Sequence, residues 1–307
     1  MFAYLLLIVN ALLVLVNSAL CSTLICCVAL VKLLLPFATL KAKATGVSNR
    51  IMWLWATINA AILGISNGVD WDVAGGEELS KDGWYLLICN HLSWTDIVVL
   101  CCVFKDRIPM PKFFLKQQLL YVPFIGMACW ALDMPFMKRY SREYLLRHPE
   151  KRGEDLRTTR RSCEKFKYTP TTVVNYVEGT RFTQQKQRAG RQEYQHLLPP
   201  KSGGIAYTLA AMGERFERII DVTLAYPDNR HLPFRDLLMG RMRRIVVRIN
   251  TLPLDEQVNG DYFNDKQFKR QFQKWLAQLW QDKDVSLQDI YQQKPTVELT
   301  REESQAN

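Results

Sequence analysis

The chain of 307 residues begins with a segment that lacks charge. Residues 1–31 contain no Asp, Glu, Lys or Arg, and no acidic residue occurs before Asp70. This apolar run is longer than the 7–15-residue core of a signal peptide, and no basic residue precedes it. It also exceeds the roughly 20 residues that cross a bilayer. We therefore expect residues 1–36 to be a membrane anchor, either one tilted transmembrane helix or a hairpin of two short helices broken near Asn17 and Ser18.

The next segment, residues 37–69, lacks acidic residues but carries Lys41, Lys43 and Arg50. An excess of Lys and Arg beside a membrane segment is typical of the cytoplasmic side, so we expect a basic loop there. The loop is followed by the apolar stretch IMWLWATINAAILGI, which is short for a span. Its tryptophans suit the membrane interface. We expect an in-plane or re-entrant helix, with a second true span as the alternative.

The eight cysteines form no CxxC pair, which argues against zinc-ribbon and thioredoxin-like motifs. Neighbours such as Cys101 and Cys102 are poor disulfide partners, and most of the cysteines lie in or beside apolar runs. We expect reduced, buried thiols in a protein that faces the cytosol. We expect no metal site.

The sequence also lacks a recognisable nucleic-acid-binding motif. Its net charge is +10, which favours an anionic partner such as nucleic acid, anionic lipid headgroups or a phosphorylated substrate. Because the membrane anchor makes nucleic acid an improbable partner, the charge predicts a protein that acts on lipids or lipid-like molecules at a phospholipid membrane.

From residue 70 to about residue 285 the hydrophobic pattern alternates between strands and helices without an internal repeat, which predicts an α/β domain. Strands are expected at residues 84–90, 171–177, 218–226 and 244–252. Helices are expected at residues 93–104, 112–126, 140–168 and 203–212, and near residues 268–280, with a basic loop at residues 181–191. Residues 286–307 are expected to be a polar C-terminal tail, disordered from about Gln293.

The polar stretch NHLSWTD, residues 90–96, lies between two apolar runs. On a single helix, His91 and Asp96 would lie about 140° apart. They can meet only if His91 lies in a loop and Asp96 in the first helical turn. Ser93 is a suitable N-cap and Ser93-x-x-Asp96 has the spacing of a capping box, so Asp96 also has a purely structural interpretation. In the catalytic interpretation, Asp96 accepts a hydrogen bond from one imidazole nitrogen and leaves the other as a base towards a substrate hydroxyl.

Three further stretches have the composition of anion sites. The first is KxxLxxxPxxG, which begins at Lys116. The second is EGTR, residues 178–181, directly after an expected strand; its glycine lets the backbone approach a ligand, and Arg181 can grip a phosphate through two hydrogen bonds. The third is PKSGG, in which Lys201 stands at the start of an expected helix. Each is weak alone, because a solvated lysine or an ion-paired arginine explains it equally well.

Taken together and in this order, the stretches resemble the glycerolipid acyltransferases of the lysophosphatidic acid acyltransferase family over about residues 70–285. NHxSWxD matches the HxxxxD block of the family, KxxLxxxPxxG its second block and EGTR its third. The stretches VEGTRFT, LPPKSGG, DVTLAYP and WLAQLWQDKD resemble the subgroup that contains lysocardiolipin acyltransferases. The resemblance is to an enterobacterial, inner-membrane member of that subgroup.

Two departures from the family pattern concern the acceptor more than the chemistry. The third block usually reads FPEGTR, whereas Tyr176 and Val177 precede Glu178 here. The fourth block usually contains a proline, whereas Ile220-Asp221-Val222 stands here.

The resemblance implies a mixed sheet flanked by helices and a membrane-bound O-acyltransferase. It would move a fatty acyl group from acyl-CoA or acyl-carrier protein to the free hydroxyl of 1-acyl-glycerol-3-phosphate, giving phosphatidic acid. His91 would be the general base and Asp96 would orient it, with direct transfer and no covalent enzyme intermediate. The acyl donor is a co-substrate, so no cofactor or metal is expected. The acceptor headgroup would be bound by Lys116, Glu178, Gly179, Thr180, Arg181 and Lys201.

Two alternatives remain open. In the first, the acceptor is a different lysophospholipid, such as lysophosphatidylglycerol or lysocardiolipin. A non-enzymatic membrane protein that binds anionic lipid through a basic face would also explain the composition. In each case the expected location is a membrane, for this family the bacterial inner membrane with the active site towards the cytoplasm.

Overall fold

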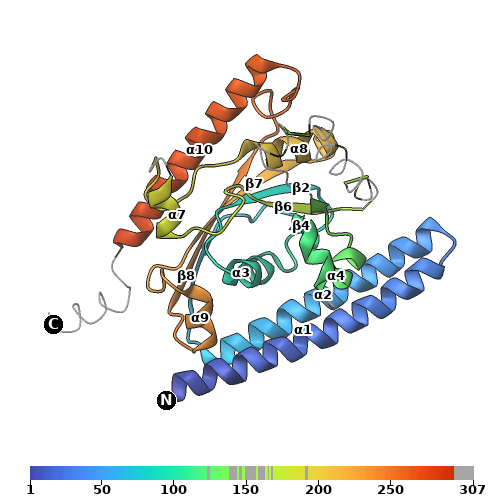
Figure 1. Cartoon of the computed structure of the whole chain (residues 1–307), viewed down its shortest axis with the longest axis vertical. Coiled ribbons are helices and arrows are strands. Elements are labelled where there is room, and N and C mark those ends of the chain that lie inside the picture. Colours follow the sequence, from blue (N-terminus) through green and yellow to red (C-terminus); the bar gives the residue numbers. More distant parts are fainter. Residues whose placement is uncertain are drawn as a thin grey trace.

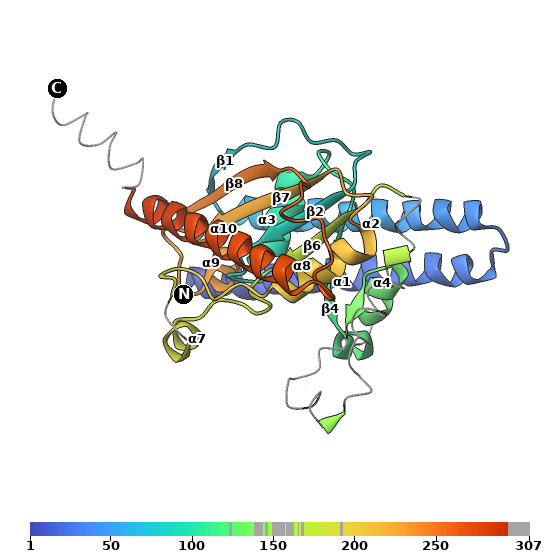
Figure 2. The same ribbon diagram turned by 90° about the horizontal axis from the view of Figure 1, so that it is seen from above.

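Two long helices form a hairpin that lies along one side of an α/β domain (Figure 1, Figure 2). They are α1 (Phe2–Leu34) and α2 (Ala38–Ser66). The computed structural model of the chain describes residues 1–122, 125–137, 169–190 and 193–293, and between these Tyr144, Arg147, His148, Arg157, Cys163, Glu164 and Phe166.

The domain is built on a six-stranded sheet with the strand order β1-β8-β7-β2-β6-β3. The β7–β8 pair is antiparallel and the other pairs are parallel, so the sheet is mixed, as predicted. Its strands are β1 (Asp70–Ala74), β2 (Tyr85–Cys89), β3 (Pro111–Phe113), β6 (Thr172–Tyr176), β7 (Arg218–Ala225) and β8 (Arg244–Leu252). A two-stranded sheet pairs β4 (Leu115–Lys116) with β5 (Phe136–Met137).

Helices cover both faces of the large sheet, and strand β2 shows how the two cores are divided. Tyr85, Leu87 and Cys89 belong to one core, which also receives side chains from α1, α2, α3, α4 and α9. Leu86 and Ile88 point to the other core, which is closed by α8 and α10. Because all five residues of β2 are buried, the strand lies at the centre of the molecule. The helices, with the short 3₁₀ helix η1, are α3 (Thr95–Phe104), η1 (Gln117–Tyr121), α4 (Ile125–Ala131), α7 (Gln184–Ala189), α8 (Ser202–Met212), α9 (Pro233–Leu238) and α10 (Lys266–Gln292).

The N-terminal hairpin agrees with one expectation and differs from another. Of the two alternatives for residues 1–36, the single helix is the one present: α1 runs unbroken through Asn17 and Ser18, because α2 satisfies both side chains. The Asn17 amide donates to the Asn59 side chain at 2.9 Å, and Ser18 Oγ accepts from Trp55 Nε1 at 3.0 Å. Residues 38–50, expected as a basic loop, form the first turns of α2 instead. Among the described residues, α1 is the one helix long and apolar enough to cross a membrane.

Two expected elements inside the domain are also wrong. Residues 112–126 were expected as a helix, but most of them form β3, β4 and η1, because β3 pairs with β6 and β4 with β5. The basic loop at residues 181–191 contains the short helix α7, which Thr183 caps by accepting from the Lys186 amide at 3.2 Å. The capping side chain offsets the lack of acidic residues in the first turn.

Helix α10 extends to Gln292, so the expected polar tail begins later than residue 286. Residues 294–307 lie outside the described part of the chain, as does most of the charge-rich segment 140–168 that was expected to be helical. All eight cysteines are free thiols, as predicted, but Cys27 is exposed and three others are only half-buried. Burial raises the pKa of Cys101 and of Cys163 to about 12, which keeps both thiols neutral.

Candidate active site

His91 and Asp96 meet at the end of the central strand. His91 follows β2 in a loop, Asp96 lies in the first turn of α3, and His91 Nδ1 contacts Asp96 Oδ2 at 2.7 Å. Because a carboxylate only accepts hydrogen bonds, this contact favours the neutral tautomer with its proton on Nδ1, in which Nε2 carries the lone pair. The loop-and-helix geometry that the spacing required is therefore present. The catalytic role of the pair stays a prediction.

The carboxylate of Asp96 is fully buried and is held by four donors. Oδ2 also accepts from the backbone amides of Leu92, at 2.7 Å, and Ser93, at 3.0 Å, while Oδ1 accepts from the hydroxyl of Tyr226 at 2.8 Å. Burial raises the pKa of Tyr226 well above its usual value and the charge of Asp96 adds to this, so the phenol remains a donor. Asp96 is thus fixed in one rotamer that aims one oxygen at His91.

The structural interpretation of Asp96 is also correct in part. Helix α3 begins at Thr95 with Trp94 at the N-cap position, one residue later than the sequence indicated. Ser93 still acts as a local cap, because its hydroxyl accepts from the Thr95 amide at 3.3 Å. The bond from the Ser93 amide to Asp96 is the reciprocal half of a capping box. One side chain therefore serves both the helix start and the histidine.

Sequence reasoning missed three residues around the pair, of which Tyr226 is one. Tyr176, the last residue of β6, stacks on the His91 ring with 4.0 Å between ring centroids. Asn90 is buried and exchanges two hydrogen bonds with the backbone of Leu224, which joins the end of β2 to β7. A usable signal existed for Asn90 and Tyr226: each ends a predicted buried strand, where its polar atoms need partners.

Glu178 connects the third block to the histidine loop, residues 90–94. Its buried carboxylate accepts from the His91 amide at 2.9 Å and from the Leu198 amide at 3.0 Å. Burial raises the pKa of Glu178 to about 8, although the two amide hydrogen bonds oppose the shift. The Phe182 amide donates to the His91 carbonyl at 2.7 Å. The EGTR turn and the histidine loop therefore form one hydrogen-bonded unit.

Replacing Glu178 with Gln should flatten the pH dependence of stability. The folded-state pKa of about 8 lies above the ordinary value of 4.5, so the stability that this group contributes falls as pH rises between these values. Gln removes that dependence, but its NH₂ faces one of the two backbone amides. This loss lowers the free energy of unfolding by about 1–3 kcal/mol at the acid end of the pH range. Melting curves of wild type and Glu178→Gln across this pH range measure both effects.

Glu217→Gln is the matched control, because the exposed Glu217 also accepts from a backbone amide, that of Trp84 at 3.3 Å. Parallel curves for wild type and Glu178→Gln would show that Glu178 does not titrate in this range.

The rest of the third block lies at the rim of the site. Gly179 adopts a φ of 68°, a left-handed conformation that favours glycine and makes the turn after β6 possible. The Arg181 guanidinium lies over the exposed Trp94 ring, 4.8 Å from its centroid. Thr180 Oγ1 accepts from Lys186 Nζ at 2.7 Å. Arg181 is therefore held beside the start of α3, close in the chain to Asp96.

The two lysines predicted to bind the acceptor, Lys116 and Lys201, are related to the site through their backbone. The Lys201 amide donates to the Val177 carbonyl at 2.9 Å, which brings the start of α8 to the third block, and the Lys201 residue is exposed. Lys116 lies in β4, but its side chain is outside the described part of the structure. The structure thus joins His91, Asp96 and Glu178 by direct hydrogen bonds, while the anion-binding roles of Lys116, Gly179, Thr180, Arg181 and Lys201 stay predictions.

The departure in the fourth block has a structural explanation. Asp221, in β7, pairs with Lys283 of α10 at 2.8 Å, and both side chains are buried. Lys283 Nζ also donates to the Val222 carbonyl at 2.7 Å and to Thr223 Oγ1 at 2.9 Å. These bonds compensate the desolvation of the ammonium group, so the acidic residue fixes α10 to the sheet.

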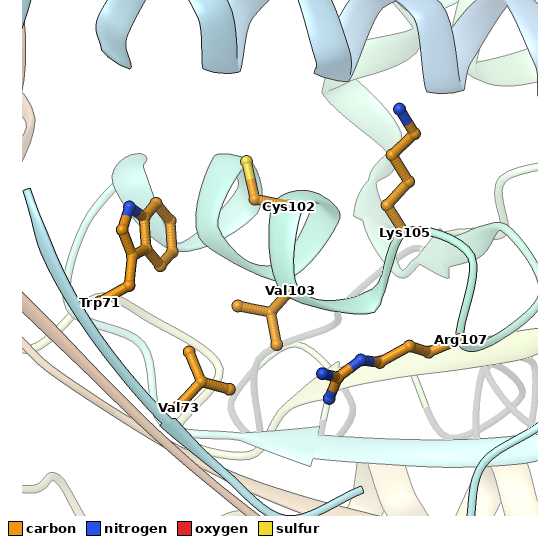
Figure 3. A pocket seen from close by; sticks show the side chains of 6 residues that line it. All are labelled: Trp71, Val73, Cys102, Val103, Lys105 and Arg107. Atoms are coloured by element: carbon orange, nitrogen blue, oxygen red, sulfur yellow. The ribbon is translucent and has the colours of Figure 1, made fainter. Parts of the chain in front are cut away.

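A cavity of about 390 Å³ lies away from this group, between β1 and α3 (Figure 3). It contains none of the predicted site residues. It lies at the β1 edge, whereas Tyr176 stacks on His91 from β6, near the opposite edge of the sheet. We do not assign this cavity to the chemistry of His91. It is lined by Trp71, Val73, Cys102, Val103, Lys105 and Arg107. No group of three or more His, Cys, Asp or Glu side chains that could hold a metal occurs among the described residues.

The family model described as Acyltransferase matches residues 70–226. The 1-acyl-sn-glycerol-3-phosphate acyltransferase gamma of Homo sapiens is 28% identical over 191 residues, which cover 60% of this chain and 46% of that protein. Lysocardiolipin acyltransferase 1 of Danio rerio is 24% identical over 229 residues, which cover 68% of this chain and 53% of that protein. The chain therefore matches about half the length of these curated relatives.

The fold is also found in a solved structure, the 1-acyl-sn-glycerophosphate (LPA) acyltransferase PlsC from Thermotoga maritima. The TM-score is 0.54 at 16% identity, and the alignment covers 94% of this chain and 99% of that chain. The predicted α/β class, with a mixed sheet flanked by helices and an apolar N-terminal helix, is confirmed.

Proposed function

Because the chain belongs to the Acyltransferase family, we propose that it is a membrane-bound O-acyltransferase that converts 1-acyl-glycerol-3-phosphate into phosphatidic acid. The observation that carries the proposal is the 2.7 Å contact between His91 Nδ1 and the buried Asp96, because it leaves Nε2 free to act as a base. The acyl donor would be acyl-CoA or acyl-carrier protein. Relatives named for lysophosphatidic acid and lysocardiolipin support a lysophospholipid acceptor.

In the proposed reaction, His91 Nε2 takes the proton of the acceptor hydroxyl as the oxygen attacks the thioester carbonyl. The buried carboxylate of Asp96 stabilises the imidazolium that forms. The tetrahedral intermediate collapses with cleavage of the carbon–sulfur bond, and the imidazolium returns the proton to the departing thiolate. General base catalysis of this kind contributes about 10²- to 10⁴-fold. Arg181, Lys116 and Lys201 would hold the phosphate of the acceptor.

We also propose that the hairpin holds the site at the membrane surface. Helix α1 is tied to the domain near both ends, through Asn10 to the Leu238 carbonyl of α9 at 2.8 Å and through Lys32 to Asp133 at 2.9 Å. Because it is attached along the domain, we favour a hairpin lying in one face of the bilayer over an upright span. Lys41, Lys43 and Arg50 support a cytoplasmic face, for which we propose the bacterial inner membrane. Large apolar side chains exposed on α1 include Phe2, Leu5, Ile8, Leu12, Leu15, Leu20, Leu24, Leu30 and Leu34.

The test is an acyl-transfer assay of the purified chain with labelled acyl-CoA and a panel of lysolipids. We expect the fastest product to be phosphatidic acid. Faster acylation of lysophosphatidylglycerol or lysocardiolipin would move the proposal to that acceptor. Salt-dependent binding to anionic vesicles without transfer to any lysolipid, from either donor, would support a lipid-binding protein and overturn the enzyme.

A further inference from the structure

The segment that carries the second block is tied to the hairpin at both of its ends. We call residues 114–132 the block-two segment; it is described except for residues 123 and 124 and the side chain of Lys116. Lys112 lies just before it and Asp133 just after it. Both side chains contact polar groups of α1 or α2, and neither residue belongs to the family-like motifs described in the sequence.

The first tie is a buried lysine. Lys112, in β3, is 3% exposed, and its ammonium donates to the Asn49 side chain of α2 at 2.7 Å. It also donates to the Leu132 carbonyl at 2.8 Å, so the same nitrogen joins the two ends of the block-two segment. Burial lowers the pKa of Lys112 to about 8, and the nearby charge of Asp133 opposes this shift. The cost of burying this amine is offset by its fixed acceptors, which is typical of a residue that holds a position.

The second tie is an ion pair. Asp133 Oδ2 contacts Lys32 Nζ, near the end of α1, at 2.9 Å, and the two side chains are 11% and 21% exposed. The Thr45 hydroxyl of α2 lies 3.5 Å from the same oxygen. Asp133 adopts a φ of 58°, which few residues other than Gly, Asn and Asp accept readily. The backbone turn after α4 therefore aims the carboxylate at both hairpin helices.

Apolar packing between the ties makes the connection stiff. Ile25 and Ala29 of α1 lie in the same buried core as Ala128 and Ala131 of α4. Alanines let two helices approach closely, and α4 lies beside the hairpin in both views (Figure 1, Figure 2). The position of the block-two segment is therefore coupled to that of the hairpin.

We propose that Lys112 and Asp133 are positioning residues: they fix the block-two segment, which would bind the acceptor, against the N-terminal hairpin. The hairpin is then a support for the block-two segment as well as a membrane attachment, and it sets where this segment stands relative to His91. This inference rests on the proposed function, because the block-two segment is the part that would bind the acceptor phosphate. It extends that function by assigning four residues outside the motifs, Lys32, Asn49, Lys112 and Asp133, to acceptor recognition.

The test compares Asp133→Asn with Asp106→Asn. The two aspartates are matched: both have positive φ, at 58° and 65°, and both pair with a lysine, since Asp106 contacts Lys81 at 2.8 Å. Asn tolerates this backbone conformation, so each substitution removes only the charge. Asp106 is exposed and bridges to a loop far along the chain from the block-two segment. It therefore controls for the loss of an ion pair as such.

The expected result is a split between kinetic constants. Asp133→Asn should raise KM for 1-acyl-glycerol-3-phosphate roughly 10- to 100-fold, because small misplacements of binding groups have effects of this size. KM for the acyl donor should stay within about twofold. Asp106→Asn should change neither. Lys32→Met removes the partner on α1 and should reproduce the rise, which keeps the test valid if Asp133→Asn folds poorly.

Amide hydrogen exchange separates this inference from the proposed reaction. In Asp133→Asn and Lys32→Met, exchange should accelerate in residues 114–132 while strands β2 and β7 remain protected, and this holds whichever lipid is the acceptor. Equal effects of Asp133→Asn and Asp106→Asn would overturn the inference. A similar rise in both KM values, together with a loss of protection across the whole domain, would also overturn it. If wild type acylates no lysolipid, the proposed function fails, and the exchange data alone then decide whether the hairpin fixes the block-two segment.

Discussion

Replacing His91 with Ala lowers kcat by about 10³-fold or more, the largest effect expected of any single substitution in the chain. The physical reason is the loss of the base that would accept the hydroxyl proton, a contribution of about 10²–10⁴ in enzymes. The measurement is the initial rate of phosphatidic acid formation with saturating donor and acceptor.

The control for this substitution is His231→Ala, because His231 is exposed and lies in the loop before α9. It should keep the wild-type rate. The melting temperature of His91→Ala should stay within a few degrees of wild type, since His91 lies in a loop and the core below it remains packed. A folded His91→Ala enzyme that retained half of the wild-type rate would exclude His91 as the base.

Replacing Asp96 with Asn should lower kcat by about 10²- to 10⁴-fold while the fold survives. Asn can present its oxygen to His91 and to the Leu92 and Ser93 amides, and its NH₂ to the Tyr226 hydroxyl, which then accepts instead of donating. Each of the four contacts still joins a donor to an acceptor in this arrangement, so the main loss is the charge that stabilises the imidazolium. Circular dichroism and melting curves beside the acyl-transfer rate separate the two effects.

Tyr226→Phe is the companion variant, because it leaves the charge of Asp96 in place and removes one donor to it. With one hydrogen bond fewer, the carboxylate attracts the imidazolium more strongly, so the acid limb of the pH–rate profile should move to higher pH. A large loss of rate in Asp96→Asn together with a displaced acid limb in Tyr226→Phe would show that both residues act on His91 through one series of hydrogen bonds. An Asp96→Asn variant with the wild-type rate would leave Asp96 as a helix cap alone.

The parts of the fold that the sequence predicted share a local cause. Buried strands such as β2 and β7 are continuous apolar runs, and the contact of His91 with Asp96 depends on only five residues of loop and helix start. In such places local propensity and tertiary packing favour the same structure, which is where prediction from sequence succeeds.

The parts that were wrong or missed depend on partners far along the chain. The pattern of residues 112–126 is that of an amphipathic helix, yet β4 exists because β5 pairs with it from more than 20 residues away. Tyr226 lies 130 residues from the carboxylate that it holds. Helix α1 continues through Asn17 because Asn59 of α2 accepts its amide hydrogen bond. Nothing within a short window of sequence reports these contacts.

The attachment of Asn10 to the Leu238 carbonyl has a consequence for how the protein is made. These two residues are 228 positions apart. Similarly, the Asn67 side chain donates to the Leu237 carbonyl, which is translated 170 positions later. At roughly 5–20 residues per second, α1 leaves the ribosome roughly 10–45 s before its last polar partner is synthesised. During that interval the first helix has an apolar surface and unsatisfied asparagines, so it needs a chaperone or the membrane itself as a temporary partner. The first element to be translated is therefore among the last to complete its native contacts.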